Sequence, residues 1–221
     1  MKDKGKNIRL KEYELVIFDI DGTLYNQKKL RLRMMMDIFI YYLLKPHKVY
    51  ELKILKIFRE EREKKKGINV ENLKIEQYRW VSLKTSYSID IIKEVVEKWI
   101  YLRPLKHLLK YKFKGLDRLL SYLNDNKIKV AIYSDYPTKS KLEALQIQAK
   151  MQVASTDKEI NALKPNPKGL LYIVKKFNID TRDCLFIGDR EVTDGKCANN
   201  AKMDYIIIDK YGHIYEDLLL V

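Results

Sequence analysis

The chain of 221 residues is 46% hydrophobic and 33% charged, and its formal net charge is +14 at pH 7. This composition is typical of a globular protein with a substantial core rather than of a disordered chain. No apolar run reaches the roughly 18 residues that a membrane-spanning helix requires, which excludes an integral helical membrane protein.

The positive charge is concentrated in one segment. Residues 25–110 carry 21 basic and 10 acidic side chains, whereas the rest of the chain is nearly balanced. Such a surplus can attract nucleic acid, a membrane surface or a small anion, or it can cover a solvated face. We favour the solvated face, and we expect neither a membrane nor a nucleic acid as a partner.

The remaining composition favours a cytoplasmic protein. Residues 1–11 are rich in lysine but lack the apolar run of a secretory signal. Cys184 and Cys197 form neither a metal-ligand spacing nor a disulfide framework. We expect reduced thiols and a monomer or weak homodimer.

The first predicted strand ends in two carboxylates. An apolar run through Phe18 is followed by Asp19, Ile20, Asp21 and Gly22. A short apolar run closed by glycine is typical of a buried parallel strand, on which residues two apart point the same way. Asp19 and Asp21 are therefore expected to face one space at the carboxyl end of the strand, where open α/β sheets bind ligands.

Two neighbouring carboxylates repel each other, so a cation must neutralise them or one of them must hold a proton. Mg²⁺ is a hard cation that carboxylates and a substrate phosphate hold together. A calcium loop that begins at Asp19 is excluded, because it requires Gly and Glu where the chain has Leu24 and Leu30. A turn with two solvated acids remains the alternative.

Residues 28–105 are predicted to form an insert of four helices. The first ends at Lys45-Pro46, the second ends before Gly67, the third covers about 70–83, and Ser88 caps the fourth. In the first helix we expect the methionine-rich and aromatic stripe to pack in the core rather than to bind a ligand. The apolar residues at helical spacing there are Leu32, Met35, Met36, Phe39, Ile40, Leu43 and Leu44.

From Pro104 onward, strands are predicted to alternate with helices. The predicted strands cover residues 128–133, 151–154, 184–187 and 205–208, and the predicted helices about 116–123, 137–145, 170–177 and 193–202. This alternation predicts a doubly wound parallel α/β sheet with right-handed crossovers. We expect an α/β core of residues 1–27 and 106–221 with a helical cap domain of residues 28–105.

Three of the predicted strands end in polar residues, namely Asp19, Ser134 and Asp189. In a parallel sheet the carboxyl ends of the strands share one edge, so these residues are expected to meet there. The shared placement makes a site at this edge a more specific prediction than any one of the residues would.

These stretches resemble the four motifs of the haloacid dehalogenase superfamily, in its phosphatase branch. The first motif is an apolar strand followed by Asp, any residue, Asp, Gly, Thr and Leu, as the chain has from Val16 to Leu24. Ser134 is similar to the second motif, Lys164 before Pro165 to the third, and Asp189 with Asp194 to the fourth. The resemblance spans about residues 14–209 and is weakest over the helical insert.

The resemblance implies a Rossmann-like core with a helical cap inserted after the first motif. It also implies a Mg²⁺-dependent phosphatase that hydrolyses a small phosphorylated metabolite through an aspartyl-phosphate. The implied catalytic residues are Asp19 as nucleophile, Asp21 as general acid and base, and Ser134 and Lys164 as phosphoryl-binding groups. The implied metal-site residues are Asp19, Asp21 through its backbone carbonyl, Asp189, and Asp194 beside the metal or Lys164.

Other functions remain open. A phosphomutase of the same superfamily shares all of these residues, and a non-catalytic protein could bind an anion or nucleic acid through the basic segment. The dehalogenase branch is disfavoured, because it lacks the second acid that Asp21 supplies here. Loose candidates for substrate contact are Tyr25, Tyr78, Arg79 and Trp80.

Overall fold

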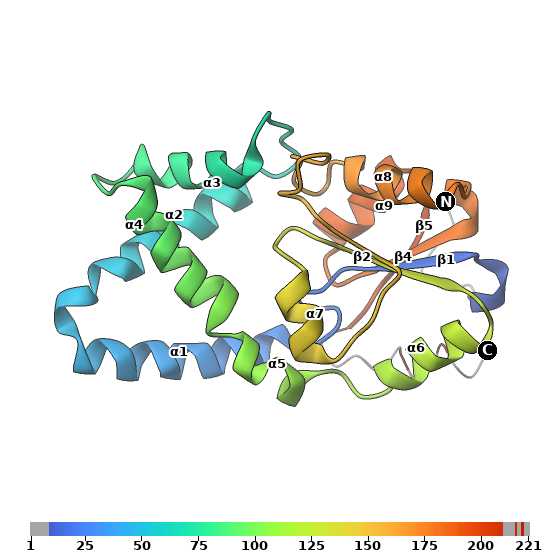
Figure 1. The fold of residues 1–221 in the computed structure, drawn as a ribbon, viewed down its shortest axis with the longest axis horizontal. Helices are drawn as coiled ribbons and strands as arrows, with labels where there is room; N and C mark the ends of the chain where they lie inside the picture. Colours follow the sequence, from blue (N-terminus) through green and yellow to red (C-terminus); the bar gives the residue numbers. More distant parts are fainter. Residues whose placement is uncertain (1–8, 210–214, 216–217, 219–221) are drawn as a thin grey trace.

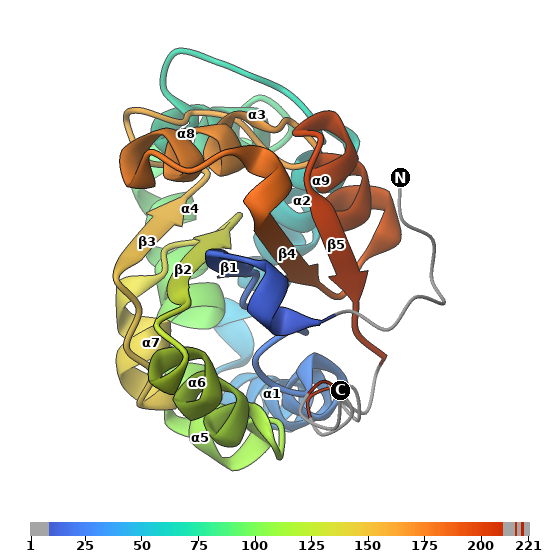
Figure 2. The same cartoon turned by 90° about the vertical axis from the view of Figure 1, so that its right-hand side faces the viewer.

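The structure is a computed structural model that describes residues 9–209, 215 and 218. Within these residues, five parallel strands form one sheet (Figure 1), and Figure 2 shows their order, β3-β2-β1-β4-β5. The strands are β1 (Leu15–Phe18), β2 (Lys129–Ser134), β3 (Met151–Ala154), β4 (Cys184–Gly188) and β5 (Asp204–Ile207). The predicted doubly wound α/β sheet is confirmed, and each predicted strand lies in its expected segment.

The central strand β1 is buried on both faces. Leu15 and Ile17 pack in one core with residues of α8 (Lys168–Phe177) and α9 (Lys196–Asn200), two helices that lie over the same side of the sheet in Figure 2. Val16 and Phe18 belong to the opposite core, to which α6 (Leu116–Asp125) and α7 (Lys139–Leu145) contribute leucines. This double burial explains why β1 is a continuous apolar run without alternation.

The helical segment between β1 and β2 lies to one side of the sheet, at the left of Figure 1. It contains the four predicted helices, which are α1 (Gln27–Leu44), α2 (Tyr50–Lys64), α3 (Leu73–Ser82) and α4 (Ile89–Val96). A π-helical turn over Glu97–Leu102 continues α4, and a further helix that the pattern did not predict, α5 (Leu105–Tyr111), leads back to the sheet. The cap boundaries at residues 28 and 105 stay a prediction.

The expectation for the α1 stripe was wrong. The side chains from Leu32 to Leu44 that were expected in the core are exposed, whereas Leu30, Met34, Asp37 and Tyr42 are buried. Because α1 is apolar around most of its circumference, spacing alone could not indicate which face turns inward. The tyrosine face turns inward because its hydroxyl groups find partners there, such as the Glu51 carboxylate that accepts from Tyr42 at 2.9 Å.

The loop between α2 and α3 is fastened to the core segment that precedes α8. The backbone N–H of Gly67 donates to the carbonyl of Lys164 at 3.2 Å, and the N–H of Leu163 donates to Ile68 at 3.0 Å. The Asn161 amide donates to the carbonyl of Glu71 at 2.7 Å. The helical segment therefore contacts the rest of the chain here as well as at its two ends.

Among the described residues, none of the helices combines the length and the apolar character needed to cross a bilayer.

Candidate active site

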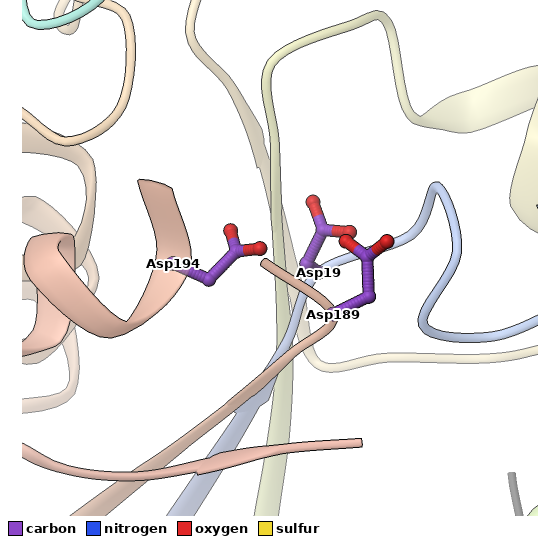
Figure 3. Close-up of side chains that lie close together, drawn as sticks. All are labelled: Asp19, Asp189 and Asp194. Carbon is purple, nitrogen blue, oxygen red and sulfur yellow. The ribbon is translucent and has the colours of Figure 1, made fainter. Parts of the chain in front are cut away.

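Three carboxylates converge at the carboxyl edge of the sheet. Asp19 follows β1 and Asp189 follows β4, and the two strands pair in parallel with Phe18 opposite Ile187. Asp194 lies on a π-helical turn, Glu191–Gly195, between β4 and α9. One carboxylate oxygen from each of the three acids lies within 4.8 Å of the others, and Asp194 points toward the other two (Figure 3). The edge lies where the strand order reverses around β1, the usual ligand position in this type of sheet.

The Lys164 ammonium joins two of these acids. Its Nζ donates to Asp19 Oδ1 at 2.6 Å and to Asp194 Oδ1 at 2.5 Å, and its side chain is only 3% exposed. Burial opposes the charged form of Lys164, but Asp19 and Asp194 outweigh it and raise the lysine pKa well above its ordinary value. Lys164 thus contacts two of the three acids, Asp19 and Asp194, and all three of these side chains are buried.

The pKa values of two of the three acids are raised, chiefly by burial. Burial raises the pKa of Asp19 well above its usual range, against the opposing effect of Lys164. Burial, and then the neighbouring charge of Asp194, raise the pKa of Asp189 to about 7. Within the part of the chain that the structure describes, no group donates a hydrogen bond to the Asp189 carboxylate.

Asp21 is held apart from the three acids. Lys141 on α7 donates to both of its carboxylate oxygens, at 2.6 and 2.5 Å, and the Tyr25 hydroxyl donates to Oδ1. Burial alone would raise the pKa of Asp21, but the Lys141 ammonium outweighs it and holds the pKa below its ordinary value. Asp21 is therefore a carboxylate in this arrangement, whereas Asp19 and Asp189 are drawn toward protonation.

Ser134 ends β2 at the same edge. It is 1% exposed, and its hydroxyl accepts from the N–H of Tyr136 at 3.3 Å. The next residue, Asp135, accepts from the N–H of Lys164 at 3.1 Å and from the Ser155 hydroxyl at 2.6 Å. Asp135 thereby fixes the backbone that carries the lysine.

Two glycines let the loop after β1, the end of β4 and the turn that carries Asp194 approach one another. A Cβ at Gly22, where φ is +97°, would lie 2.2 Å from Asp189 Oδ2. A Cβ at Gly188 would lie 2.4 Å from the Cβ of Asp194. Any larger residue at either position would push a carboxylate out of the cluster, so the acids can crowd together only because these positions carry no side chain.

The cluster suits a hard divalent cation. Its donors are carboxylate oxygens from Asp19, Asp189 and Asp194, two of which also contact Lys164, and Mg²⁺ prefers oxygen ligands. Burial raises the pKa of both Asp19 and Asp189, and a bound cation would favour the ionised form of both acids. The Asp21 side chain is not part of this group.

The structure thus brings Asp19, Lys164, Asp189 and Asp194 together. Asp21 lies two residues after Asp19, and Ser134 ends the neighbouring strand β2. Of the candidates for substrate contact, Tyr25 lies beside Asp21, whereas Tyr78 and Trp80 are buried and Arg79 is exposed.

Lys141 and Asp135 were not predicted from the sequence as site residues. Lys141 lies in the first turn of α7, directly after the segment of Ser134. The first turn of a helix that follows a parallel strand lies near the carboxyl edge of the sheet. The position of Lys141 shortly after β2 was therefore the one feature of the sequence that could have indicated it. Asp135 adjoins Ser134 but resembled an ordinary turn residue.

The chain is similar to known proteins in sequence and in structure. Residues 16–208 match the family model described as haloacid dehalogenase-like hydrolase. A search of curated proteins found no match.

Solved structures with the same fold include a β-phosphoglucomutase from Clostridium difficile, with 17% identity and a TM-score of 0.64, covering 95% of this chain and 100% of that one. A 2-haloacid dehalogenase from Pseudomonas syringae has 15% identity and a TM-score of 0.61, with 88% and 86% covered. A phosphatase from Thermococcus onnurineus has 19% identity and a TM-score of 0.58, with 89% and 86% covered.

At these identities the structural likeness shows the fold alone. The family model, in contrast, covers nearly the whole α/β sheet and each of the four motif segments. The chain belongs to the haloacid dehalogenase-like hydrolases.

Proposed function

We propose that this hydrolase is a Mg²⁺-dependent phosphatase that acts on a small phosphomonoester through an aspartyl-phosphate. The observation that carries the proposal is the buried Asp19 carboxylate, which contacts Lys164 and lies within 4.8 Å of Asp189 and Asp194. A second acid, Asp21, is two residues along the same loop. A carboxylate nucleophile with an acid/base partner suits displacement at phosphorus better than simple ligand binding.

In the first step, an oxygen of Asp19 attacks phosphorus and the ester oxygen leaves with a proton from Asp21. In the second step, a water molecule loses a proton to Asp21 and attacks the phosphorus, which releases phosphate and restores the Asp19 carboxylate. Lys164 donates to the oxygens that carry negative charge, and the Ser134 hydroxyl at the end of β2 is available to do the same. Because Lys141 holds Asp21 as a carboxylate, Asp21 must take up a proton before it can serve as the acid.

Mg²⁺ would neutralise phosphoryl charge beside Asp19, Asp189 and Asp194 when bound. Its presence can be tested without turnover. Because the pKa values of Asp19 and Asp189 are raised, the folded protein without metal holds protons that the unfolded chain has lost above about pH 4. Its stability should therefore fall as pH rises through about 7.

Mg²⁺ competes with those protons, so we expect it to raise the melting temperature little at about pH 5 and clearly more at about pH 8. Thermal melts with Mg²⁺ or with a chelator measure this difference. Asp189→Asn should lose most of the Mg²⁺ effect, while Asp125→Asn, at an exposed site, should keep it. An equal Mg²⁺ effect at both pH values and in Asp189→Asn would contradict the site.

Lys141 is proposed to position Asp21 and to set its charge. Lys141→Met removes the cation that lowers the Asp21 pKa, so that pKa should rise and the pH profile of kcat/KM should move to higher pH. The matched control is Lys139→Met, an exposed lysine on the same helix, which should leave the profile in place. A profile that does not move in Lys141→Met would remove Lys141 from this role.

The phosphomutase and dehalogenase reactions can be distinguished from phosphatase activity by their products. A panel of phosphorylated metabolites with Mg²⁺ should release free phosphate if the protein is a phosphatase. A sugar phosphate whose phosphoryl group moves between hydroxyl groups would instead identify a phosphomutase. Halide release from a 2-haloacid would identify a dehalogenase, which the second acid Asp21 disfavours.

A further inference from the structure

One face of α1 is apolar and open to solvent. It consists of seven side chains, each between 52% and 76% exposed, which we call the α1 outer face: Leu32, Met35, Met36, Phe39, Ile40, Leu43 and Leu44. Their spacing places them in one stripe that runs roughly 18 Å along the helix. Soluble monomers rarely expose so many large apolar side chains together, and such patches commonly mark an interaction site.

The exposure does not result from a shortage of interior space. The opposite face of α1 places Asp37 and Tyr42 in the interior, where Asp37 pairs with Lys106 and His107 at 3.0 Å each. The helix therefore buries Leu30, Met34 and Tyr42 together with one carboxylate, Asp37, and leaves the α1 outer face in solvent. The buried carboxylate and hydroxyl require these specific partners, and the α1 outer face is left for contact with something else.

Cations lie at both ends of the α1 outer face. Lys28, Lys29 and Arg31 precede it, and Lys45 and Lys48 follow it. The only acid among residues 27–49 is Asp37, which is buried. The α1 outer face is thus an apolar stripe with positive charge at both ends. A complementary partner offers an apolar surface to the stripe and negative charge to the cations at its ends.

A second copy of this chain does not have that character. If two α1 helices pair side by side, in parallel or antiparallel orientation, the basic end of one helix meets a basic end of the other. A partner helix that binds in a groove is also disfavoured, because α1 forms the outer margin of the helical segment, with its neighbours on one side (Figure 1). An anionic bilayer offers both an apolar layer and negative headgroups along a flat surface.

We propose that the α1 outer face docks on an anionic lipid bilayer, with α1 lying in the interface parallel to the membrane plane. The apolar side chains enter the boundary between headgroups and acyl chains, while the lysines and Arg31 contact lipid phosphates. The helix does not span the bilayer, in accord with its length and charge. This proposal replaces the expectation from the sequence that no membrane is a partner.

The test uses the full chain with vesicles that contain phosphatidylcholine and phosphatidylglycerol, and with vesicles of phosphatidylcholine alone. Wild type should float with the anionic vesicles at low salt, and should be released by high salt. The triple variant Met36→Gln, Phe39→Gln, Leu43→Gln should bind on the order of tenfold or more weakly, because it removes buried apolar area. Leu83→Gln, which changes a leucine that is 86% exposed on α3's C-terminal side, should bind like wild type.

A second readout locates the contact. In Phe39→Trp, the emission of the new indole should shift to shorter wavelength with anionic vesicles and should be quenched by brominated acyl chains, since Trp80 and Trp99 are already buried. The proposal is overturned if wild type does not bind anionic vesicles, or if the triple variant binds equally well. It is also overturned if light scattering shows a dimer that the triple variant abolishes, or if a partner protein occupies the face while vesicles do not bind.

Discussion

Asp19→Asn is expected to abolish turnover while the fold remains intact. An amide has nearly the same shape as the carboxylate but cannot act as the nucleophile, and the covalent step has no substitute for it. The same substitution removes one of three crowded carboxylates, and burial raises the pKa of this one well above its usual range, so the metal-free variant should also be more stable than wild type near neutral pH. Phosphate release and thermal melts with a chelator measure the two effects.

The combination of lost activity and gained stability distinguishes a functional carboxylate from a structural one. Asp125→Asn, at an exposed position at the end of α6, should change neither quantity. Steady turnover by Asp19→Asn at a rate near that of wild type would contradict the covalent mechanism. A large loss of stability would show that Asp19 serves the fold instead.

Lys164→Met should have the largest effect on stability. It removes the only ammonium that contacts both Asp19 and Asp194 among the described residues, and it leaves the acids buried without their cation. Breaking a buried pair by removing one partner typically costs about 3–5 kcal/mol of the free energy of unfolding. Activity should be lost as well, because the phosphoryl oxygens lose a donor.

The sign of the pH dependence provides a further check. Burial raises the pKa of Asp19 well above its usual range, and its protonation removes a charge that Lys164 balances, so the deficit of Lys164→Met should be smaller at about pH 5 than at about pH 8. Denaturant unfolding at both pH values measures it. The double variant Lys164→Met, Asp194→Asn should recover part of the stability, because a charge is removed together with its partner. The exposed Lys175→Met is the control, and a Lys164→Met variant as stable as that control at both pH values would refute the account.

The sheet and its acids could be predicted from the sequence because they depend on local and repetitive features. An apolar run buried on both faces predicts a central parallel strand, and a polar residue at its end must lie at the ligand edge. Asp19, Ser134 and Asp189 follow from this rule alone. Asp194 did not, because a π-helical turn brings it back toward β4, and only the family resemblance singled it out.

Contacts between distant segments could not be predicted in this way. Lys141 lies 120 residues from Asp21, and a lysine in a helix normally extends into solvent. The orientation of α1 was predicted wrongly for a related reason. Its inward face is chosen by partners on other helices, such as Glu51 for Tyr42, and not by its own apolar spacing.

The hydrogen bonds between the α2–α3 loop and residues 161–164 have a mechanical consequence. The chain passes from the sheet to the helical segment before α1 and returns after α4, and a segment joined only at these two places could rotate about the line between them. The hydrogen bonds from Gly67 to Lys164 and from Leu163 to Ile68 join the two parts at a third place. One of these bonds ends on the carbonyl of Lys164. The helical segment therefore cannot rotate away from the sheet unless these bonds break or Lys164, which contacts Asp19, is displaced. In the proposed phosphatase, any movement of the helical segment that admits a substrate is therefore coupled to the position of Lys164 beside Asp19.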